Sequence, residues 1–273
     1  MPTETGLALR PLTVSLEGIG LLGPGLAGWR AGLAILANHV GYQPSATVMP
    51  LPTALPQAER RRSGKAVKLA LAVGQEAAAA AGLDPSTLAT VFSSSGGDGY
   101  NCHEICATLA SGDRRISPTR FHNSVHNAPA GYWSIAVGAM APSSVMCGFD
   151  ASFGAGLLEA VTQVAVDGVH TLLIAYDTDY PEPLRSVRPI VDAFGVALVL
   201  APADSTRAWA EITVALTAAA PDPLDNADLE VLKLAIPAAR SLPLLQAIAQ
   251  GRPKRVVLDY LAPLRLAVDV VPC

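Results

Sequence analysis

The sequence predicts an α/β fold in which helices cover both faces of a sheet. Short apolar runs rich in Val, Ile and Leu alternate along the chain with longer helical segments. These runs are continuous rather than alternating in polarity, which is typical of strands buried on both faces. The chain has 273 residues, 51% of them hydrophobic and 15% charged, and so contains enough apolar material for one large core.

The first part of the chain combines three helices with two strands. The predicted elements are a strand at 12–17, a glycine-rich turn at 18–25, a short helix at 28–36, a proline-containing loop at 48–57, a helix from Ser63 to Ala81, a strand at 88–93, a flexible loop at 93–99 and a helix at 101–109. Ser63 is expected to cap its helix, and Gly82 to end it. The alanines at 77–81 indicate close packing against another backbone.

The stretch 116–160 predicts a loop, a helix, a short apolar strand, a sharp turn and a second helix. This is the layout around a nucleophile elbow. The later predicted elements are a helix at 152–166, strands at 171–176, 193–200 and 210–216, helices at 225–234 and 242–250, and strands at 256–259 and 264–271.

Composition excludes several classes of protein. The net charge is −4 and no basic tract is interleaved with aromatic residues, which argues against nucleic acid as a partner. The apolar segments at 69–81, 135–140 and 194–201 are too short or too interrupted for a bilayer span of about 20 residues. With no signal peptide apparent at the N-terminus, the expected location is the cytoplasm. The apolar composition then indicates a large contact with another subunit.

The four cysteines are expected to be reduced in that compartment. Cys102, His103 and Cys106 form a cluster with too few ligands for zinc, and small buried residues on a helix are the better interpretation. No metal or other cofactor is therefore expected.

The spacing of Gly18, Gly20 and Gly23 after a strand imitates a dinucleotide fingerprint. Pro24 and Gly25 interrupt the turn, and no second strand ends in an acid for the ribose. Glycines that permit a tight turn under a helix are the preferred interpretation, and a nicotinamide-dependent oxidoreductase is kept as an alternative.

Several motifs around the elbow layout resemble those of β-ketoacyl synthases, which have a thiolase-like fold. The matching pieces are Ser117-Pro118, Phe121, residues 127–131, Pro142-Ser143 and the helix at 151–160. The resemblance implies a single domain over 1–273, made of two related βαβ halves in an α-β-α-β-α layering. The first half is expected at 1–168, and a shortened second half at 169–273.

Two departures from the family pattern concern catalysis. The position of the family's active cysteine is occupied by Asp150, and only His170 remains where two histidines are expected in the second half. Residues 260–263 stand where a histidine or asparagine and a glycine-rich turn are expected. A carboxylate is a weak acyl acceptor, so this chain by itself is expected not to catalyse condensation.

Family members that have lost the cysteine are chain-length factors, which pair with an active ketosynthase and shape the tunnel for the growing chain. Residues 122–133 are similar to a compact subgroup associated with aryl polyene and related pigments. The resemblance thus implies a heterodimer with an active β-ketoacyl synthase, working on chains bound to an acyl carrier protein.

Three groups of side chains are candidate sites. Hydrogen bonds near the partner interface are expected from His122, Asn123, His126 and Asn127. The basic residues Arg60, Arg61, Arg62 and Lys65 are interpreted either as a solvated helix start or as a docking site for the acidic carrier. Phe149 and Phe153 are candidate tunnel stoppers beside Asp150. Cys147 remains an alternative nucleophile for an acyltransferase, although its alternation with Val145 and Phe149 favours a buried, inert thiol.

Overall fold

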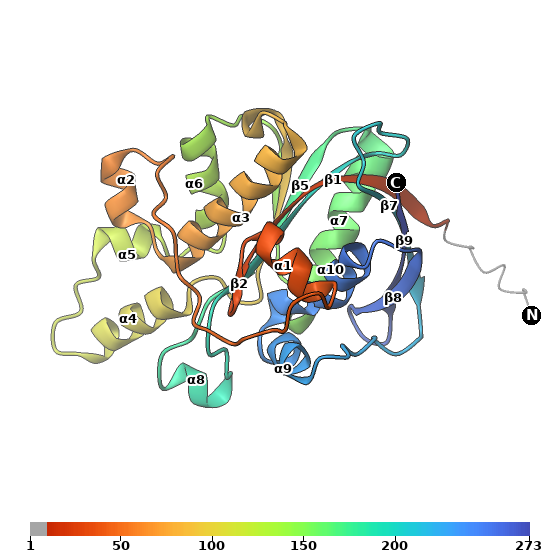
Figure 1. Ribbon diagram of the computed structural model, residues 1–273. Coiled ribbons are helices and arrows are strands. Elements are labelled where there is room, and N and C mark those ends of the chain that lie inside the picture. The colour runs from red at the N-terminus through yellow and green to blue at the C-terminus, as the bar shows by residue number, and fades with distance from the viewer. Residues whose placement is uncertain (1–9) are drawn as a thin grey trace, which may run out of the picture.

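One mixed sheet forms the centre of the computed structural model, which describes residues 10–273 (Figure 1). Its strands are β1 (Leu12–Gly23), β2 (Leu26–Ala27), β3 (Ala89–Ser93), β4 (Ser143–Met146), β5 (Thr171–Asp177), β6 (Phe194–Pro202), β7 (Ala210–Thr217), β8 (Lys254–Asp259) and β9 (Arg265–Pro272). Their order is β4-β3-β5-β6-β1-β7-β9-β8, and β2 pairs with β1. Among residues 10–273 the parallel pairs are β3 with β4 and β3 with β5, so the carboxyl ends of these three strands lie at the same edge of the sheet.

The helices of the described residues are α1 (Trp29–Leu36), α2 (Gln57–Arg62), α3 (Lys65–Ala81), α4 (Gly99–Ala110), α5 (Pro118–His122), α6 (Ala128–Val137), α7 (Ser152–Asp167), α8 (Leu184–Val187), α9 (Ala227–Ala235) and α10 (Leu242–Ala249). Three turns of 3₁₀ helix add η1 (Pro85–Thr87), η2 (Phe149–Ala151) and η3 (Pro237–Ser241). Among these helices, none combines the length and the apolar character that crossing a membrane requires.

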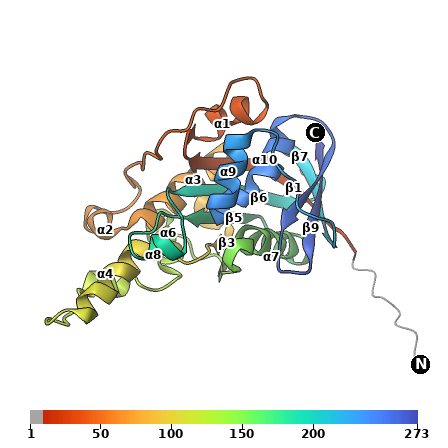
Figure 2. The ribbon, with the colours of Figure 1, turned by 90° about the horizontal axis from the view of Figure 1, so that it is seen from below.

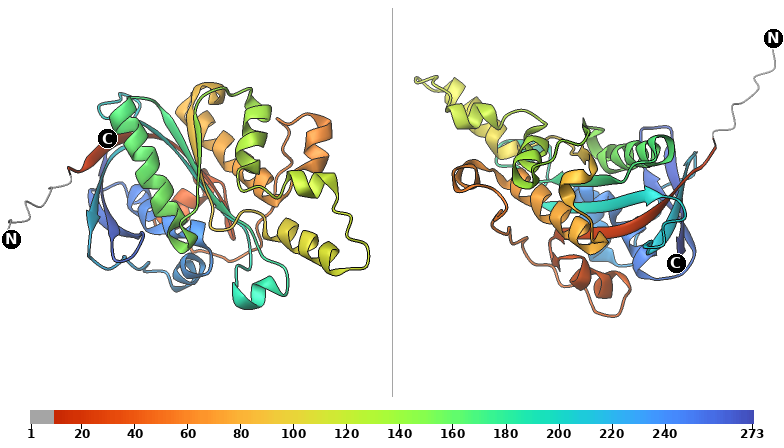
Figure 3. Two further views of the ribbon diagram at one scale, coloured as in Figure 1. Left: turned by 180° about the vertical axis from the view of Figure 1, so that it is seen from behind. Right: turned by 90° about the horizontal axis from the view of Figure 1, so that it is seen from above.

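Helices α3 and α7 pack on opposite faces of β1, β5 and β6 (Figures 1 and 3). Successive residues of a strand point to opposite faces, and β5 shows this directly. Leu172 and Ile174 belong to the apolar cluster of α3, whereas Leu173 belongs to the cluster of α7. The strand is buried along its whole length, which is why its sequence reads as one continuous apolar run.

The sheet continues past β1 into β7, β9 and β8, whose inner face joins the same cluster as α7 and α10. These helices therefore form a middle layer between the first part of the sheet, made of β4, β3, β5, β6 and β1, and the second part, made of β7, β9 and β8 (Figure 1). The outer face of the second part is polar: Thr213 is hydrogen-bonded to Thr13, and Arg255 pairs with Asp269 at 2.6 Å. Within residues 10–273 no helix covers this face. The shortening of the second half stays a prediction.

Strands β5 and β6, which follow residue 168, lie between β3 and β1 in the first part of the sheet. The two parts are thus interleaved along the chain. The division of the single domain at residue 168 stays a prediction.

The predicted glycine turn is wrong, because β1 continues through Gly18 and Gly20 to Gly23 with a bulge after Leu16. A Cβ atom on Gly18 would collide with the backbone of Ala77, and one on Gly20 with that of Val73. These glycines thus allow α3 to approach β1 closely, as the alanine run predicts. A dinucleotide fingerprint needs a turn into a helix at this point, so the oxidoreductase alternative has no structural basis.

The predicted start of α3 is also wrong. Its N-cap residue is Gly64, with no side-chain cap, and Ser63 instead ends the separate helix α2. The Ser63 hydroxyl donates to the carbonyl of Arg60 within that short helix. The predicted end is confirmed, since Gly82 has the left-handed φ of 65° that favours glycine.

Candidate functional site at the elbow between β4 and α7

The three parallel strands bring polar residues together where they end. Ser94 and Ser95 follow β3, the turn at 147–151 follows β4, and Asp177 is the last residue of β5. In open α/β sheets the carboxyl ends of parallel strands are the usual place for a ligand or a reacting group. This edge is therefore the candidate functional site, and the turn at 147–151 is called the elbow below.

The elbow turns sharply at Phe149, whose φ of 53° is unusual for a residue with a side chain. Ser152 stabilises the turn, because its hydroxyl accepts from Gly148 N–H at 3.0 Å and donates to the Phe149 carbonyl at 2.7 Å. Asp150 follows the bend and lies in η2, directly before α7. The structure thus confirms the layout that the sequence predicts for this segment.

Asp150 is held by two arginines from distant parts of the chain. Arg188, in the loop after β5, donates from Nη2 to Oδ1 at 2.8 Å, and Arg240, in η3, donates from Nη2 to Oδ2 at 3.2 Å. The Arg188 guanidinium also lies 3.8 Å from the centre of the Phe149 ring, a cation–π contact. The Asp150 carboxylate is therefore engaged on both oxygens.

Arg240 continues the network into the second part of the sheet, since its Nη1 pairs with Asp259 at the end of β8 at 3.1 Å. Gly154 in α7 makes this approach possible, because a Cβ atom there would collide with the Asp259 carbonyl. The elbow is thereby connected to both parts of the sheet.

Asp177 is the second carboxylate at this edge, and it is fully buried. It accepts hydrogen bonds from the backbone and hydroxyl of Ser95, at 2.9 and 2.6 Å, and from Ala238 N–H at 2.8 Å. Burial raises the pKa of Asp177 to about 6, and the hydrogen bonds from Ser95 oppose that shift. Desolvation is therefore the reason that the pKa of Asp177 lies above the ordinary value of an aspartate.

The prediction that Cys147 is buried is wrong. Strand β4 ends at Met146, so Cys147 belongs to the turn, and its thiol is exposed while donating to the Ser95 carbonyl at 3.3 Å. In the described part of the chain no imidazole hydrogen-bonds this thiol. His170 precedes β5 and lies at the amino end of that strand, opposite the elbow. At 3.3 Å per strand residue, this places it about 20 Å from Cys147.

The two phenylalanines of the elbow differ in environment. Phe149 is 61% exposed beneath Arg188, whereas Phe153 is 1% exposed and belongs to the core. Neither lines the two cavities described below, and their role as tunnel stoppers stays a prediction.

Of the four residues in the predicted polar cluster, Asn123 and His126 make side-chain hydrogen bonds that fix the loop after α5. Asn123 is buried and donates from Nδ2 to the Arg62 carbonyl at 2.7 Å, and His126 Nε2 contacts the Ser94 carbonyl at 3.2 Å. His122 and His126 do not share a helical face, because α5 ends at His122. Asn127 precedes α6 without making a side-chain cap. Contact of these residues with a partner stays a prediction.

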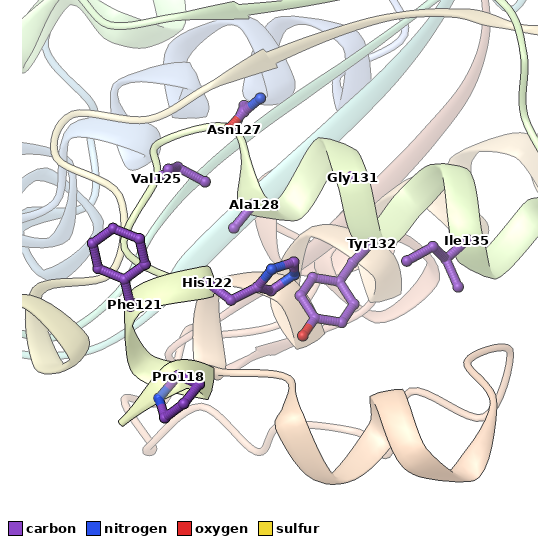
Figure 4. A pocket seen from close by; sticks show the side chains of 9 residues that line it. All are labelled: Pro118, Phe121, His122, Val125, Asn127, Ala128, Gly131, Tyr132 and Ile135. Carbon is purple, nitrogen blue, oxygen red and sulfur yellow. The ribbon is translucent and has the colours of Figure 1, made fainter. Parts of the chain in front are cut away.

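An apolar cavity of about 550 Å³ opens between α5 and α6 (Figure 4). The His122 ring points toward Tyr132 and meets it edge-on, with 6.1 Å between the ring centres. Phe121, Val125 and Ile135 line the cavity and are 68%, 53% and 50% exposed. A gathering of large exposed apolar side chains on one region is typical of an interaction surface.

The predicted basic cluster is largely engaged within the chain. Arg60 donates to the carbonyls of Leu55 and Thr53, Arg62 pairs with Glu59 at 3.2 Å, and Lys65 pairs with Asp179 at 2.8 Å. Arg61 is exposed and forms no ion pair within residues 10–273. Of the four, Arg61 is the cation most available to a partner.

The prediction that Cys102 and Cys106 are buried is wrong as well, because both are exposed on α4. This helix projects from the body of the molecule and buries only Gly99 and Asn101 (Figure 2). Partial desolvation by its neighbours on α4 still raises the pKa of the exposed Cys102 thiol, and Cys106 adds to the effect. This thiol is therefore poorly suited to act as a nucleophile.

Four residues of the site were missed from the sequence: Asp177, Arg188, Arg240 and Asp259. The sequence carried a signal for the two acids, because Asp177 directly follows one predicted strand and Asp259 ends another. The two arginines lie in stretches without any motif.

This elbow, set at the edge of a layered mixed sheet, defines a thiolase-like protein of the ketosynthase class. Residues 37–242 match the family described as "Beta-ketoacyl synthase, N-terminal domain", and because the match covers most of the chain, this protein belongs to that family. No curated protein sequence matches it significantly.

Solved structures confirm the fold. The chain is similar to a ketosynthase in complex with its chain length factor from Xenorhabdus doucetiae, with 21% identity, a TM-score of 0.72, and coverage of 94% of this chain and 99% of the other. The ishigamide ketosynthase/chain length factor shows 14% identity, a TM-score of 0.71, and coverage of 96% and 99%. A type II polyketide ketosynthase in complex with an acyl-carrier protein shows 12% identity, a TM-score of 0.74, and coverage of 97% and 100%.

Proposed function

We propose that this chain is a non-catalytic ketosynthase-like subunit, a chain-length factor, that pairs with an active β-ketoacyl synthase during polyketide or fatty-acid-type chain elongation. The observation that carries the proposal is the state of the elbow. Asp150 lies where the family's thiol is expected, and both of its carboxylate oxygens are engaged by arginines. A carboxylate in this state is a weak acyl acceptor. His170 lies at the amino end of β5, away from the elbow, and so does not reach Asp150.

An uncovered sheet edge supports pairing with another subunit. In the part of the chain that the structure describes, β4 is the outermost strand on its side of the sheet, and its hydrogen-bonded partners are all in β3. Met140, three residues before β4, is 96% exposed, and Phe121 and Val125 add an apolar surface at the cavity between α5 and α6. An open strand edge is a template for another chain, and exposed apolar side chains are typical of an interaction surface. The proposed partner is an active ketosynthase, in keeping with the complexes whose folds this chain resembles.

An acyl carrier protein is the second proposed partner. A cavity of about 650 Å³ has Arg62, Lys65, Arg120 and Arg185 in its wall, together with Asp98 and Asp179. Each of these four cations has an ion-pair partner within the chain, so the exposed Arg61, which follows Arg60 on α2, is the cation most available to a carrier. Arginine and lysine suit the phosphate and acidic side chains of a carrier. The proposed pathway is that of aryl polyenes or related pigments, and the proposed location is the cytoplasm, where free cysteines such as those of this chain persist.

Co-expression tests the proposal directly. The tagged chain, produced together with a candidate ketosynthase from a neighbouring reading frame, is expected to co-purify as a 1:1 complex. When the isolated chain is incubated with an acyl thioester, the intact mass of the chain is expected to stay unchanged. A chain that stays alone beside every such ketosynthase contradicts the pairing, and condensing activity of the isolated chain contradicts the non-catalytic assignment.

The exposure of Cys147 favours one second candidate, an acyltransferase that uses this thiol. In that case an acyl thioester would add a covalent mass to the wild type, and Cys147→Ala would lose the adduct. The same mass measurement therefore separates the two functions.

A further inference from the structure

The two arginines at the elbow contact the same carboxylate with the arrangement of a carboxylate-binding site. Arg188 and Arg240 each donate one N–H to a different oxygen of Asp150, at 2.8 and 3.2 Å. Their side chains are only 20% and 18% exposed, whereas the Asp150 side chain is 39% exposed. Charge-assisted hydrogen bonds from fixed guanidinium groups are the usual means by which proteins recognise carboxylates.

Each arginine is also held in place by contacts that do not involve Asp150. The Phe149 ring supports the Arg188 guanidinium at 3.8 Å, and Asp259 holds Nη1 of Arg240 at 3.1 Å. Arg240 Nε is buried and has no acceptor among residues 10–273, so this guanidinium has an unused donor. The two cations are therefore positioned in advance, independently of the carboxylate between them.

Asp150 is the ion-pair partner that the two arginines share. Without it, Arg240 keeps its pair with Asp259, whereas Arg188 keeps no ion pair among residues 10–273 and only the more distant charge of the buried Asp177. An unbalanced cation that is mostly removed from water is costly and attracts any small anion that fits.

We propose that Arg188 and Arg240 form a carboxylate-binding site that the chain fills with its own Asp150. Its ligand class is the small organic carboxylate, such as acetate or malonate. In the wild-type chain the Asp150 carboxylate occupies this site and excludes an external carboxylate. The occupied site lies at the position where the family's catalytic residue is expected. This inference concerns the chain alone and does not depend on pairing with a ketosynthase.

Removal of the internal carboxylate tests the proposal. Asp150→Gly opens the space and is expected to bind acetate and malonate with dissociation constants on the order of 1 mM, in line with the limits on ligands of a few atoms. Calorimetry measures binding, and the thermal midpoint of this variant is expected to rise with acetate but not with sodium chloride of equal ionic strength.

Three controls distinguish acetate binding at this site from a general effect of acetate. The wild type and Asp150→Asn, which fills the same space without charge, are expected to show no acetate-specific effect. The double variant Asp150→Gly with Arg188→Gln is expected to lose at least about tenfold in affinity, because one of the two charged contacts is gone. Equal acetate binding by all variants, or none by Asp150→Gly, overturns the proposal.

A variant that fails to fold still gives an answer. If Asp150→Gly is unfolded in chloride, its circular dichroism is expected to recover in acetate, because a ligand that binds only the native state stabilises it. No recovery in acetate or malonate counts as a failure of the proposal.

Discussion

Asp177, at the end of β5, accepts a hydrogen bond of 2.8 Å from the backbone N–H of Ala238 in η3. Through this contact one fully buried carboxylate connects the first part of the sheet to the segment that carries Arg240. The same carboxylate accepts from Ser95, so it also fixes the loop after β3. The position of the elbow network therefore depends on a buried carboxylate whose pKa burial raises to about 6.

The stability of the protein is expected to depend on the protonation of Asp177. Burial raises its pKa from 3.8 to about 6 in the folded state, so between these values the folded protein binds a proton that the unfolded chain has lost. The free energy of unfolding is then expected to fall as pH rises from about 4 to above 6, by roughly 3 kcal/mol.

Urea unfolding at pH 4, 5, 6 and 7 measures this slope. Asp177→Asn is expected to abolish it, whereas Asp269→Asn, at the surface, should leave it intact. A slope that persists in Asp177→Asn assigns the effect to another group.

The contact of β1 with α3 predicts a strong difference between two glycines. Gly20→Ala places a methyl group against the Val73 carbonyl and is expected to destabilise the protein by roughly 3 kcal/mol. Gly131 lies within α6 with no atom near its missing Cβ, so Gly131→Ala is expected to stabilise the helix by about 0.5–1 kcal/mol. Urea unfolding compares the two, and similar losses would contradict the packing described for β1.

The two arginines are also expected to activate a thiol placed at the elbow. In Asp150→Cys the introduced sulfur lies beside two guanidinium groups at the start of α7, and nearby cations favour thiolate. Iodoacetamide is expected to modify it about tenfold faster than Cys147, as followed by peptide mass. Arg188→Gln in the same background should slow the reaction, and equal rates with and without Arg188 would refute this reasoning.

The proposed subunit contact predicts which apolar residues matter. Phe121→Asp is expected to weaken the complex with a ketosynthase by about 30-fold or more, because large apolar side chains dominate binding energy. Val231→Asp, at a similarly exposed position on α9, is the matched control and should have little effect. Titration calorimetry or analytical ultracentrifugation gives both affinities, and the reverse order would place the interface on another surface.

Carrier binding is expected to depend on Arg61 more than on its neighbours, which are engaged within the chain. Arg61→Glu should weaken binding of an acyl carrier protein severalfold and reduce its dependence on salt. Arg30→Glu, an exposed site on α1, is the charge-matched control. Equal effects of the two variants would indicate only a response to net charge.

The sequence by itself determined the α/β class, most elements and the layout of the elbow, because these depend on local periodicity, caps and turns. It also placed Asp150 at the turn. Exposure was harder to predict. Cys147, Cys102 and Cys106 were expected to be buried, but β4 ends at Met146, one residue before Cys147, and α4 projects from the sheet.

Only the tertiary structure decided what Asp150 contacts. Arg188 and Arg240 are 38 and 90 residues away along the chain, and neither has a local pattern that marks it. Their convergence follows from the parallel register of β3, β4 and β5 and from the close approach of α7 to β8 at Gly154. Such contacts depend on long-range packing, which a one-dimensional pattern does not encode.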